Sequence, residues 1–349
     1  MSIRFTVIIA TSNRPELAAQ AIGSVLAQDY ANLEVIVVNN GSSDKNLSVY
    51  NKHFLALKHL YGDRVRFFPG VGAAFPALGP SMARNLGIHH ASGDYIGFCD
   101  DDDIWTDSGY LRTLAAHLPQ LQPDIVFADQ RAVDSEGTVT KTTWFSYPFT
   151  SESPSYNAEC SSSHNCQPFT VTPAYFYQHG GFPHLNITFY RHELLSRFGG
   201  FRKDLFYEED MELFLRLIGH SNLMLHYPSV VAEHRIPAKR FASASNMLTD
   251  RDKLLTRLSL FSQLAITHNN PEVIKSARRG ACFAAKQLTL IFLSQREIPR
   301  AFRMAKLALS WEFSWKWLLG STFLFIKSLF IRPGEPASEE VCKTAGNSK

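Results

Sequence analysis

Four consecutive aspartates at positions 100–103 directly follow an apolar segment, residues 95–99, in the sequence YIGFCDDDD. Two carboxylates about 4 Å apart repel each other by roughly 4 kcal/mol at an effective dielectric constant of about 20. A run of four therefore requires solvent, protonation or a bound cation. Mg2+ or Mn2+ would suit clustered oxygen ligands. The alternative is a solvated acidic loop before a helix that begins near Asp107, where acids suit the helix N-terminus.

The elements that must position these acids follow a regular order. Apolar segments of strand length alternate with helical patterns, and the strands are expected at residues 6–10, 33–38, 65–68, 95–99 and 124–128. This alternation predicts an α/β fold with a doubly wound, mainly parallel sheet and right-handed crossovers. Ligands of such sheets bind beyond the carboxyl ends of the strands. The polar segments 11–14, 39–44 and 100–103, which follow three of the strands, should therefore line one crevice.

Composition and missing motifs exclude several classes of function. The chain has 35 Lys and Arg against 32 Asp and Glu, and a net charge of +3 is too small for a protein whose main work is nucleic-acid binding. The five scattered cysteines fit reduced thiols in the cytoplasm better than a disulfide framework. The apolar run at residues 5–10 is shorter than that of a signal peptide and is expected to be a strand. No glycine-rich dinucleotide fingerprint follows the first strand and no Walker sequence occurs, which disfavours a Rossmann dehydrogenase and a P-loop NTPase.

Five segments in this order resemble family 2 glycosyltransferases, which have the GT-A fold: TVIIATSNRP, VIVVNNGSSD, MARNLGI, YIGFCDDDDIW and GGFRKDLFYEEDMELFLRL. The resemblance covers roughly residues 3–235. It implies transfer of a sugar from a nucleotide diphosphate, usually with inversion, with Mn2+ or Mg2+ as cofactor. A UDP-sugar is the first expectation for the donor. The acceptor is expected to be a hydroxyl of a glycan, a lipid-linked saccharide or a protein.

The resemblance implies a nucleotide-sugar site made of Thr11, Asn13, Arg14, Asn39, Arg84, Asp100 and Asp101. Arg84 could balance phosphate charge or form a fork to it, and the alternative is an arginine on the surface of a helix. Asn39 departs from the family, which usually has an acid that accepts from the N3–H of the base. An asparagine can accept through its carbonyl oxygen but also donates, so the identity of the base stays open.

The metal ligands implied by the resemblance are Asp102, Asp100 and His234, with Asp100 and Asp102 matching the DxD motif. For His234 the alternative is a histidine that packs or bonds locally. Glu209 and Asp210 match the ED motif of the family. Asp210 would accept the proton of the acceptor hydroxyl as a general base, and Glu209 would orient the acceptor or the base. The alternative is that these acids are placed by the dipole of the helix they begin.

The middle of the sequence is less informative. Residues 150–173 are rich in Ser, Thr, Pro and Asn and are expected to form an acceptor-side loop or lid. Cys160, His164 and Cys166 lack the paired CxxC spacing that would favour a zinc site. His179 and His184 are expected to be loop histidines rather than ligands.

We expect a catalytic domain at residues 1–240, with a nucleotide-sugar half at 1–130 and an acceptor-side half at 131–240. A helical appendage at 241–333 and a disordered tail at 334–349 should follow. The longest uncharged run of the last helical segment, residues 317–326, is about half of the 20 or so residues that a spanning helix requires. The tryptophans and lysines of residues 311–331 fit a helix in the membrane interface, or aromatics that pack the appendage against the catalytic domain.

The sequence therefore predicts a cytoplasmic enzyme, peripheral on the membrane if residues 311–331 bind lipid. A catalytically silent nucleotide-sugar-binding or scaffold protein is the main alternative, and Asn39 leaves room for it. A nucleotidyltransferase is disfavoured because the glycine-rich loop with Arg and Lys is missing after the first strand. The oligomeric state does not follow from the sequence.

Overall fold

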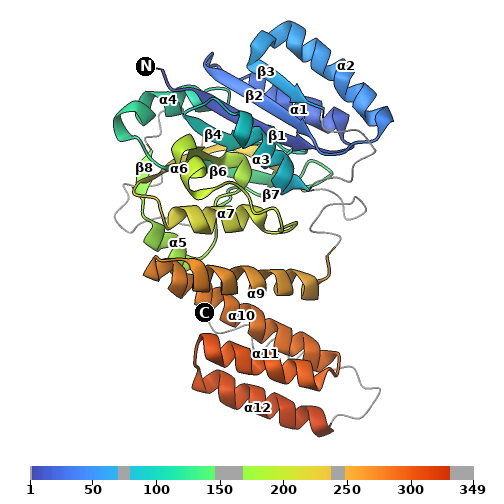
Figure 1. Ribbon diagram of the computed structural model, residues 1–349, viewed down its shortest axis with the longest axis vertical. Helices are drawn as coiled ribbons and strands as arrows, with labels where there is room; N and C mark the ends of the chain where they lie inside the picture. The colour runs from blue at the N-terminus through green and yellow to red at the C-terminus, as the bar shows by residue number, and fades with distance from the viewer. Residues whose placement is uncertain (1, 70–78, 146–167, 237–247, 331–349) are drawn as a thin grey trace. The chain divides into compact units, whose positions relative to one another are not determined.

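The computed structural model describes residues 2–69, 79–145, 168–236 and 248–330. The chain forms two compact units, residues 1–243 and 244–349 (Figure 1). The first unit contains a sheet with strand order β3-β2-β1-β4-β9-β6-β10-β5, and β7 and β8 pair with β6 and β10. The predicted α/β class, with helices in a C-terminal unit, is confirmed.

The first four strands are parallel: β1 (Phe5–Thr11), β2 (Leu33–Asn39), β3 (Val65–Phe68) and β4 (Tyr95–Phe98). They are connected through α1 (Pro15–Leu26), α2 (Asp44–Tyr61) and α3 (Pro80–His90). Val7 and Ile9 of β1 share a core with the buried face of α1. Ile8 points to the other face, because neighbours in a strand alternate, and lies against Gly87 of α3. Helices therefore cover both faces of the sheet, which requires strands that are apolar throughout.

The second half of the unit adds β6 (Ile125–Val133) and β10 (Met224–Arg235), which run parallel to each other. Three short strands pair antiparallel at their sides, namely β5 (Ile104–Trp105), β7 (Val139–Lys141) and β8 (Phe169–Val171). The short strand β9 (Thr188–Arg191) runs antiparallel between β4 and β6 and joins the two halves. The longest ladders, β1–β2 and β6–β10, are parallel, as predicted for the sheet.

The other α-helices among the described residues of this unit are α4 (Tyr110–Leu121), α5 (Pro173–His179), α6 (His192–Phe198) and α7 (Glu209–Ile218). The loop before α7 is tied to α3 by the side chain of Asn85. Its Nδ2 donates to the carbonyl of Phe201 at 2.8 Å, and its Oδ1 accepts from the Phe201 N–H at 2.8 Å. The segments MARNLGI and GGFRKDLFYEED are thus held side by side.

The strand registers bring the polar segments to one edge of the sheet. Thr11 pairs with Asn39 in the β1–β2 ladder, and Ile8 pairs with Phe98, two residues before Asp100. The aspartates continue into β5, whose Ile104 pairs with Glu233 of β10. The acidic loop is therefore fixed between the end of β4 and the end of β10.

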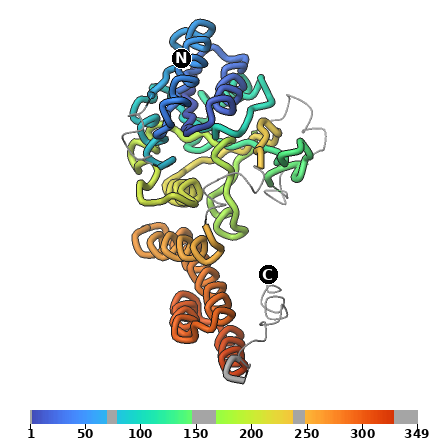
Figure 2. Tube along the Cα trace, turned by 90° about the vertical axis from the view of Figure 1, so that its right-hand side faces the viewer, coloured from blue at the N-terminus to red at the C-terminus, as the bar shows by residue number. Residues whose placement is uncertain are grey.

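The second unit consists of α9 (Asp250–Thr267), α10 (Pro271–Ser294), α11 (Ile298–Trp311) and α12 (Trp315–Phe330), orange to red in Figure 2. A capping box of Thr249 and Asp252 begins α9, and Asn270 caps α10 ahead of Pro271. Small side chains such as Ala281, Ala285 and Ala301 fill its core and allow the helices to approach closely. Among the described residues, no helix is long and apolar enough to cross a membrane.

Candidate active site

The side chains at the strand ends form three linked groups. In the first, Arg14 donates from Nη1 to Asp101 at 3.1 Å and to Asp102 at 2.8 Å. Thr11 Oγ1 donates to Asp101 at 2.7 Å and lies 2.7 Å from the hydroxyl of Tyr50. Four predicted nucleotide-sugar or metal residues are thus in direct contact, and Tyr50, which the sequence did not indicate, supports them.

In the second group Arg84 joins the acidic loop to the first turn of α7, which lies 125 positions after Arg84 in the chain. It donates from Nη2 to Asp100 and from Nη1 to Glu209, both at 2.8 Å. Its guanidinium also lies 5.3 Å from the ring centroid of Phe201. Arg84 is only 9% exposed, so it is not an arginine on the helix surface. It brings the acidic loop and the first turn of α7 into one site.

Asp210 occupies the first turn of α7, just after Glu208, which turns the chain with a positive φ of 60°. Its Oδ1 accepts from the N–H of Met211 at 2.8 Å. Burial, and then the neighbouring charge of Glu209, raise the pKa of Asp210 to about 7, against the opposing bond from Met211 and the charge of Arg84. A carboxylate with a pKa near the working pH suits proton transfer.

The pKa values of Asp100 and Asp102 in the acidic loop are shifted in opposite directions. Burial and the charges of Asp100 and Asp101 raise the pKa of Asp102 to about 6. Burial would also raise the pKa of Asp100, but the charge and hydrogen bond of Arg84, together with the charges of His184 and His234, outweigh it and the net shift is downward. The loop therefore keeps one acid strongly ionised and holds another that a cation would help to ionise.

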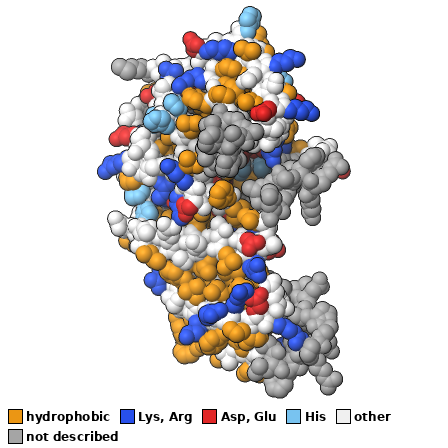
Figure 3. All heavy atoms as spheres, turned by 45° about the vertical axis from the view of Figure 1, so that its right-hand side comes forward, with side chains coloured by type: hydrophobic (Ala, Val, Ile, Leu, Met, Phe, Trp, Pro, Cys, Tyr) orange, Lys and Arg blue, Asp and Glu red, His pale blue; other side chains and the backbone are white. Residues whose placement is uncertain are grey.

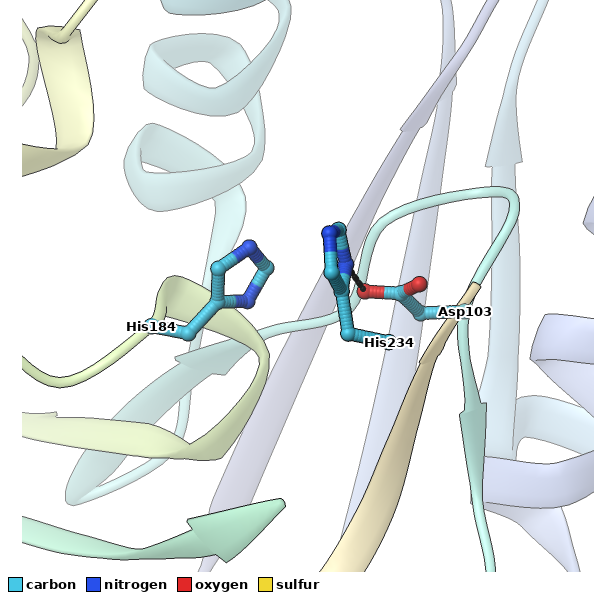
Figure 4. Close-up of side chains that lie close together, drawn as sticks. All are labelled: Asp103, His184 and His234. Atoms are coloured by element: carbon cyan, nitrogen blue, oxygen red, sulfur yellow. Dashed lines mark hydrogen bonds and ion pairs between the residues drawn. The ribbon is translucent and has the colours of Figure 1, made fainter. Parts of the chain in front are cut away.

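The third group contains Asp103, His184 and His234, whose potential ligand atoms all lie within 4.8 Å of one another (Figure 4). Asp103 is fully buried, and its Oδ2 lies 3.1 Å from His234 Nδ1. Its Oδ1 accepts from the N–H of Arg235 at 2.8 Å. Burial would lower the pKa of His234, but the bond to Asp103 and the charges of the nearby aspartates together outweigh it, and the net shift is upward. A carboxylate with two imidazoles is a donor set that Mn2+ accepts.

Asn13 and Asn39 shape the loops around the site. Asn39 Oδ1 accepts from Ser42 Oγ at 2.5 Å, and its Nδ2 donates to the carbonyl of Pro69 at 2.7 Å. Asn13 has a positive φ of 58°, and its Oδ1 accepts from the N–H of Ser43 at 2.9 Å. Both polar ends of the Asn39 amide are thus bonded within the chain, and the amide keeps one further N–H and one further lone pair with which it could contact a base.

Besides Tyr50, sequence reasoning missed Asp103 and His184 as residues of the site. Asp103 belongs to the run of four acids but falls outside the DxD spacing, so only its pairing with His234 shows its place. His184, expected to be a loop histidine, is 9% exposed and lies beside His234. A single histidine in an irregular segment carries no pattern that could have indicated this. The alternative zinc residues, Cys160, His164 and Cys166, lie outside the described residues.

The comparisons with known proteins bear on the family and the fold of the chain. The family model described as glycosyl transferase family 2 matches residues 6–179. The Streptococcus pneumoniae protein named glycosyltransferase GlyA is 32% identical over 135 residues, which are 38% of this chain and 18% of that protein. The Campylobacter jejuni GalNAc(5)-diNAcBac-PP-undecaprenol beta-1,3-glucosyltransferase is 36% identical over 111 residues, 32% of this chain and 33% of the relative. The chain thus spans a third or less of the length of these relatives.

Solved structures share the fold at low identity. S. aureus TarS 1-349 in complex with UDP-GlcNAc has a TM-score of 0.61 and 15% identity, covering 93% of this chain and 89% of that one. The mannosyltransferase PcManGT from Pyrobaculum calidifontis, in complex with GDP-Man and Mn2+, has a TM-score of 0.55 and 19% identity, covering 95% and 81%.

The doubly wound sheet and the cluster of acids at its strand ends define an enzyme of the GT-A class. With the family match over residues 6–179, the chain belongs to glycosyltransferase family 2, as the sequence segments predicted.

Proposed function

We propose that this chain transfers a sugar from a nucleotide diphosphate to an acceptor hydroxyl, with inversion at the anomeric carbon. The observation that carries the proposal is the Arg84 bridge, which holds Asp100 and Glu209 at 2.8 Å each. It joins the loop expected at the donor to the helix that bears the expected base. A UDP-sugar is the first candidate, because TarS was solved in complex with UDP-GlcNAc, while GDP-Man in PcManGT keeps guanosine open.

Asp102, Asp100 and His234 are the residues proposed to hold Mn2+ or Mg2+. Carboxylate oxygens and one imidazole fit this group, and the imidazole favours Mn2+ over Mg2+. When bound, the ion would neutralise charge on the two phosphates of the donor. Arg14 donates to Asp102 Oδ2 at 2.8 Å, and this bond fixes the orientation of the carboxylate that is proposed to bind the ion.

Asp210 is proposed to act as the general base. The bond from Met211 N–H to Oδ1 orients its carboxylate, and Oδ2 would take the proton of the acceptor hydroxyl. Inversion in a single displacement requires attack from the side opposite the leaving diphosphate. Glu209, because it is bonded to Arg84, would position the base and the first turn of α7 rather than touch the acceptor.

The second unit is proposed to contact a membrane surface through α12. A stripe of exposed apolar side chains runs along α12 at helical spacing, formed by Trp315, Leu319, Phe323 and Ile326, which are 67%, 67%, 64% and 50% exposed. Hydrophobic side chains of this unit lie on the surface in Figure 3. Lys316 and Lys327 flank the stripe, as in helices that lie in the interface of anionic membranes. The name of the Campylobacter jejuni relative contains an undecaprenol-linked saccharide, which supports a lipid-linked acceptor.

The membrane contact can be tested with the double variant Leu319→Glu/Phe323→Glu. It should remain folded, because both side chains are exposed, and should no longer pellet with vesicles that contain anionic lipid. The matched control is Leu55→Glu on α2, an exposed leucine outside the stripe that is 69% exposed. Equal pelleting of all three proteins would refute the proposed contact. Peripheral attachment at the cytoplasmic face of a membrane is part of the same proposal.

The catalytic proposal can be tested by titrating nucleoside diphosphates in the presence of Mn2+. Wild type should bind UDP or GDP, and Asp102→Ala should lose the part of the affinity that depends on the metal. Unchanged affinity in Asp102→Ala would remove this residue from the metal site. A catalytically silent nucleotide-sugar-binding protein, the alternative that Asn39 leaves open, would bind the nucleotide but release no product with any donor.

A further inference from the structure

The two histidines of the third group differ in the hydrogen bonds that their ring nitrogens make. His234 Nδ1 faces Asp103, a carboxylate that also accepts from the backbone of Arg235. An ionised carboxylate only accepts, so Nδ1 of His234 carries the proton. In the neutral ring this leaves the lone pair on Nε2, which is the arrangement that carboxylate and histidine pairs use to bind metals.

His184 has the opposite arrangement. Its Nδ1 accepts a hydrogen bond from the N–H of Asn186 at 3.3 Å, which caps the short helix Leu185–Ile187. A ring nitrogen that accepts from an N–H has no proton of its own, so the proton of the neutral ring lies on Nε2. Protonation of the ring would leave Nε2 with its proton as well. In neither state does Nε2 offer a lone pair to a cation.

The neighbours of His184 place its Nε2–H in the proposed nucleotide-sugar site. The rings of His184 and His234 have centroids 4.7 Å apart, and His234 lies between His184 and Asp103 (Figure 4). Trp144 packs edge-on against both rings, at 5.2 Å and 5.9 Å, which limits their rotation. Asp100 and Arg84 are close enough to His184 to interact with it electrostatically. Among the described residues, no hydrogen bond engages Nε2 of His184.

We propose that His184 donates a hydrogen bond from Nε2 to a phosphate oxygen of the nucleotide diphosphate, next to a cation that His234 binds through its own Nε2. The proposal rests on the proposed function and assigns the three candidate ligands different tasks. His234 binds the cation, Asp103 orients His234, and His184 binds the anion. Hydrogen bonds from a nitrogen to an anionic oxygen are the stronger kind, so the loss of this one should be measurable.

Two substitutions distinguish the roles of the two ring nitrogens of His184. His184→Asn keeps a side-chain acceptor at the position of Nδ1, and asparagine is a good helix cap, but it has no group at the position of Nε2. His184→Gln places an amide N–H where Nε2 was. His179→Asn is the matched control, because it makes the same change at an exposed histidine. His234→Asn is the control for a lost metal ligand.

The experiment measures Mn2+ binding without nucleotide by electron paramagnetic resonance, and then UDP and GDP binding with Mn2+ by calorimetry. His184→Asn should keep the Mn2+ affinity of wild type and lose nucleoside diphosphate affinity by about tenfold or more. His184→Gln should recover most of that loss, and His179→Asn should match wild type. His234→Asn should lose Mn2+ affinity.

Two results would overturn the inference while leaving the proposed function intact. Weakened Mn2+ binding in His184→Asn without nucleotide would make His184 a metal ligand. Unchanged nucleotide affinity in His184→Asn, with wild type binding well, would leave His184 as a helix cap only. Failure of wild type to bind any nucleoside diphosphate would instead refute the proposed function and this inference with it. Nitrogen NMR of histidine-labelled protein, assigned with His184→Gln, should show the proton of His184 on Nε2.

Discussion

Two arginines bind the carboxylates of the candidate site, and one of them is more deeply buried than the other. The side chain of Arg14 is 31% exposed and binds Asp101 and Asp102, which are neighbours in one loop. The side chain of Arg84 is 11% exposed and binds Asp100 and Glu209, which belong to different elements. The arginine near the surface orders one loop, whereas the buried arginine holds two parts of the unit together.

This difference in exposure implies that the ion pairs of Arg14 and of Arg84 contribute differently to the stability of the fold and to ligand binding. Exposed pairs contribute about 0–1 kcal/mol, because water screens them. Removing one partner of a buried pair costs roughly 3–5 kcal/mol, because the remaining charge is left without compensation. We therefore expect Arg84 to be required for the fold of the site and Arg14 mainly for its ligands.

The largest expected effect is that of Arg84→Met. It leaves Asp100 and Glu209 without their cation and should lower the free energy of unfolding by roughly 3–5 kcal/mol in urea. The double variant Arg84→Met/Glu209→Gln should recover part of the loss, because it removes one of the two uncompensated charges. A loss below about 1 kcal/mol in Arg84→Met would show that the ion pairs of Arg84 contribute no more to stability than exposed pairs do, and would contradict the proposed difference from Arg14.

The next effect concerns the base that lies beside the Arg84 bridge. Asp210→Asn should slow transfer by roughly a hundredfold or more, the range for a lost general base, while the affinity for the donor is retained. Single-turnover kinetics and calorimetry on the same preparation measure the two quantities. Transfer at the wild-type rate would show that another group takes the proton.

The pH dependence should follow from the same carboxyl. Because the pKa of Asp210 is raised to about 7 and the base must be ionised, kcat/KM should rise with pH up to about pH 7. The rising limb should disappear in the residual activity of Asp210→Asn. A wild-type profile that is flat from pH 5 to 8 would contradict the assignment.

Stability should change with pH in the opposite direction. A carboxyl whose pKa is raised from 3.8 to about 7 takes up a proton on folding between these values, so its stabilising contribution is present at low pH and is lost as pH rises. Asp210→Asn should therefore be more stable than wild type at pH 8, with a smaller difference at pH 4. Urea unfolding at the two pH values measures this, and the reverse order would show that Asp210 is stabilised as an anion.

The smallest expected effect on stability is that of Arg14→Met. It should lower the free energy of unfolding by at most about 1 kcal/mol, because its pairs are partly exposed. It should still weaken nucleotide binding with Mn2+, since Asp102 loses its partner. A stability loss as large as that of Arg84→Met would contradict the proposed difference in stability between the ion pairs of Arg14 and those of Arg84.

Much of the fold could be predicted because the first strands are buried on both faces. Val7, Ile8 and Ile9 are all buried, and a continuous apolar run of that kind is visible in the sequence. The strand β9 could not be predicted. It has four residues, TFYR, and is defined by pairing with β4 and β6, which no local pattern records.

The candidate site also has residues that the sequence could indicate and residues that it could not. Asp100, Asp102 and Asp210 stand in recognisable motifs, so sequence could indicate them before any geometry was known. The partners that set their charge states come from distant segments, as when Arg84 meets Glu209 across 125 positions. His184 is the extreme case, because only the folding of the segment before β9 brings it to His234.

The central claim is that the aspartates after β4 and the first turn of α7 face one bound donor. Anomalous diffraction from a crystal grown with Mn2+ and UDP tests it most directly. We expect a manganese peak at Asp102 and His234, with the diphosphate beside it and Asp210 across the sugar pocket. A manganese or nucleotide bound elsewhere, or an Asp210 remote from the diphosphate, would contradict the account.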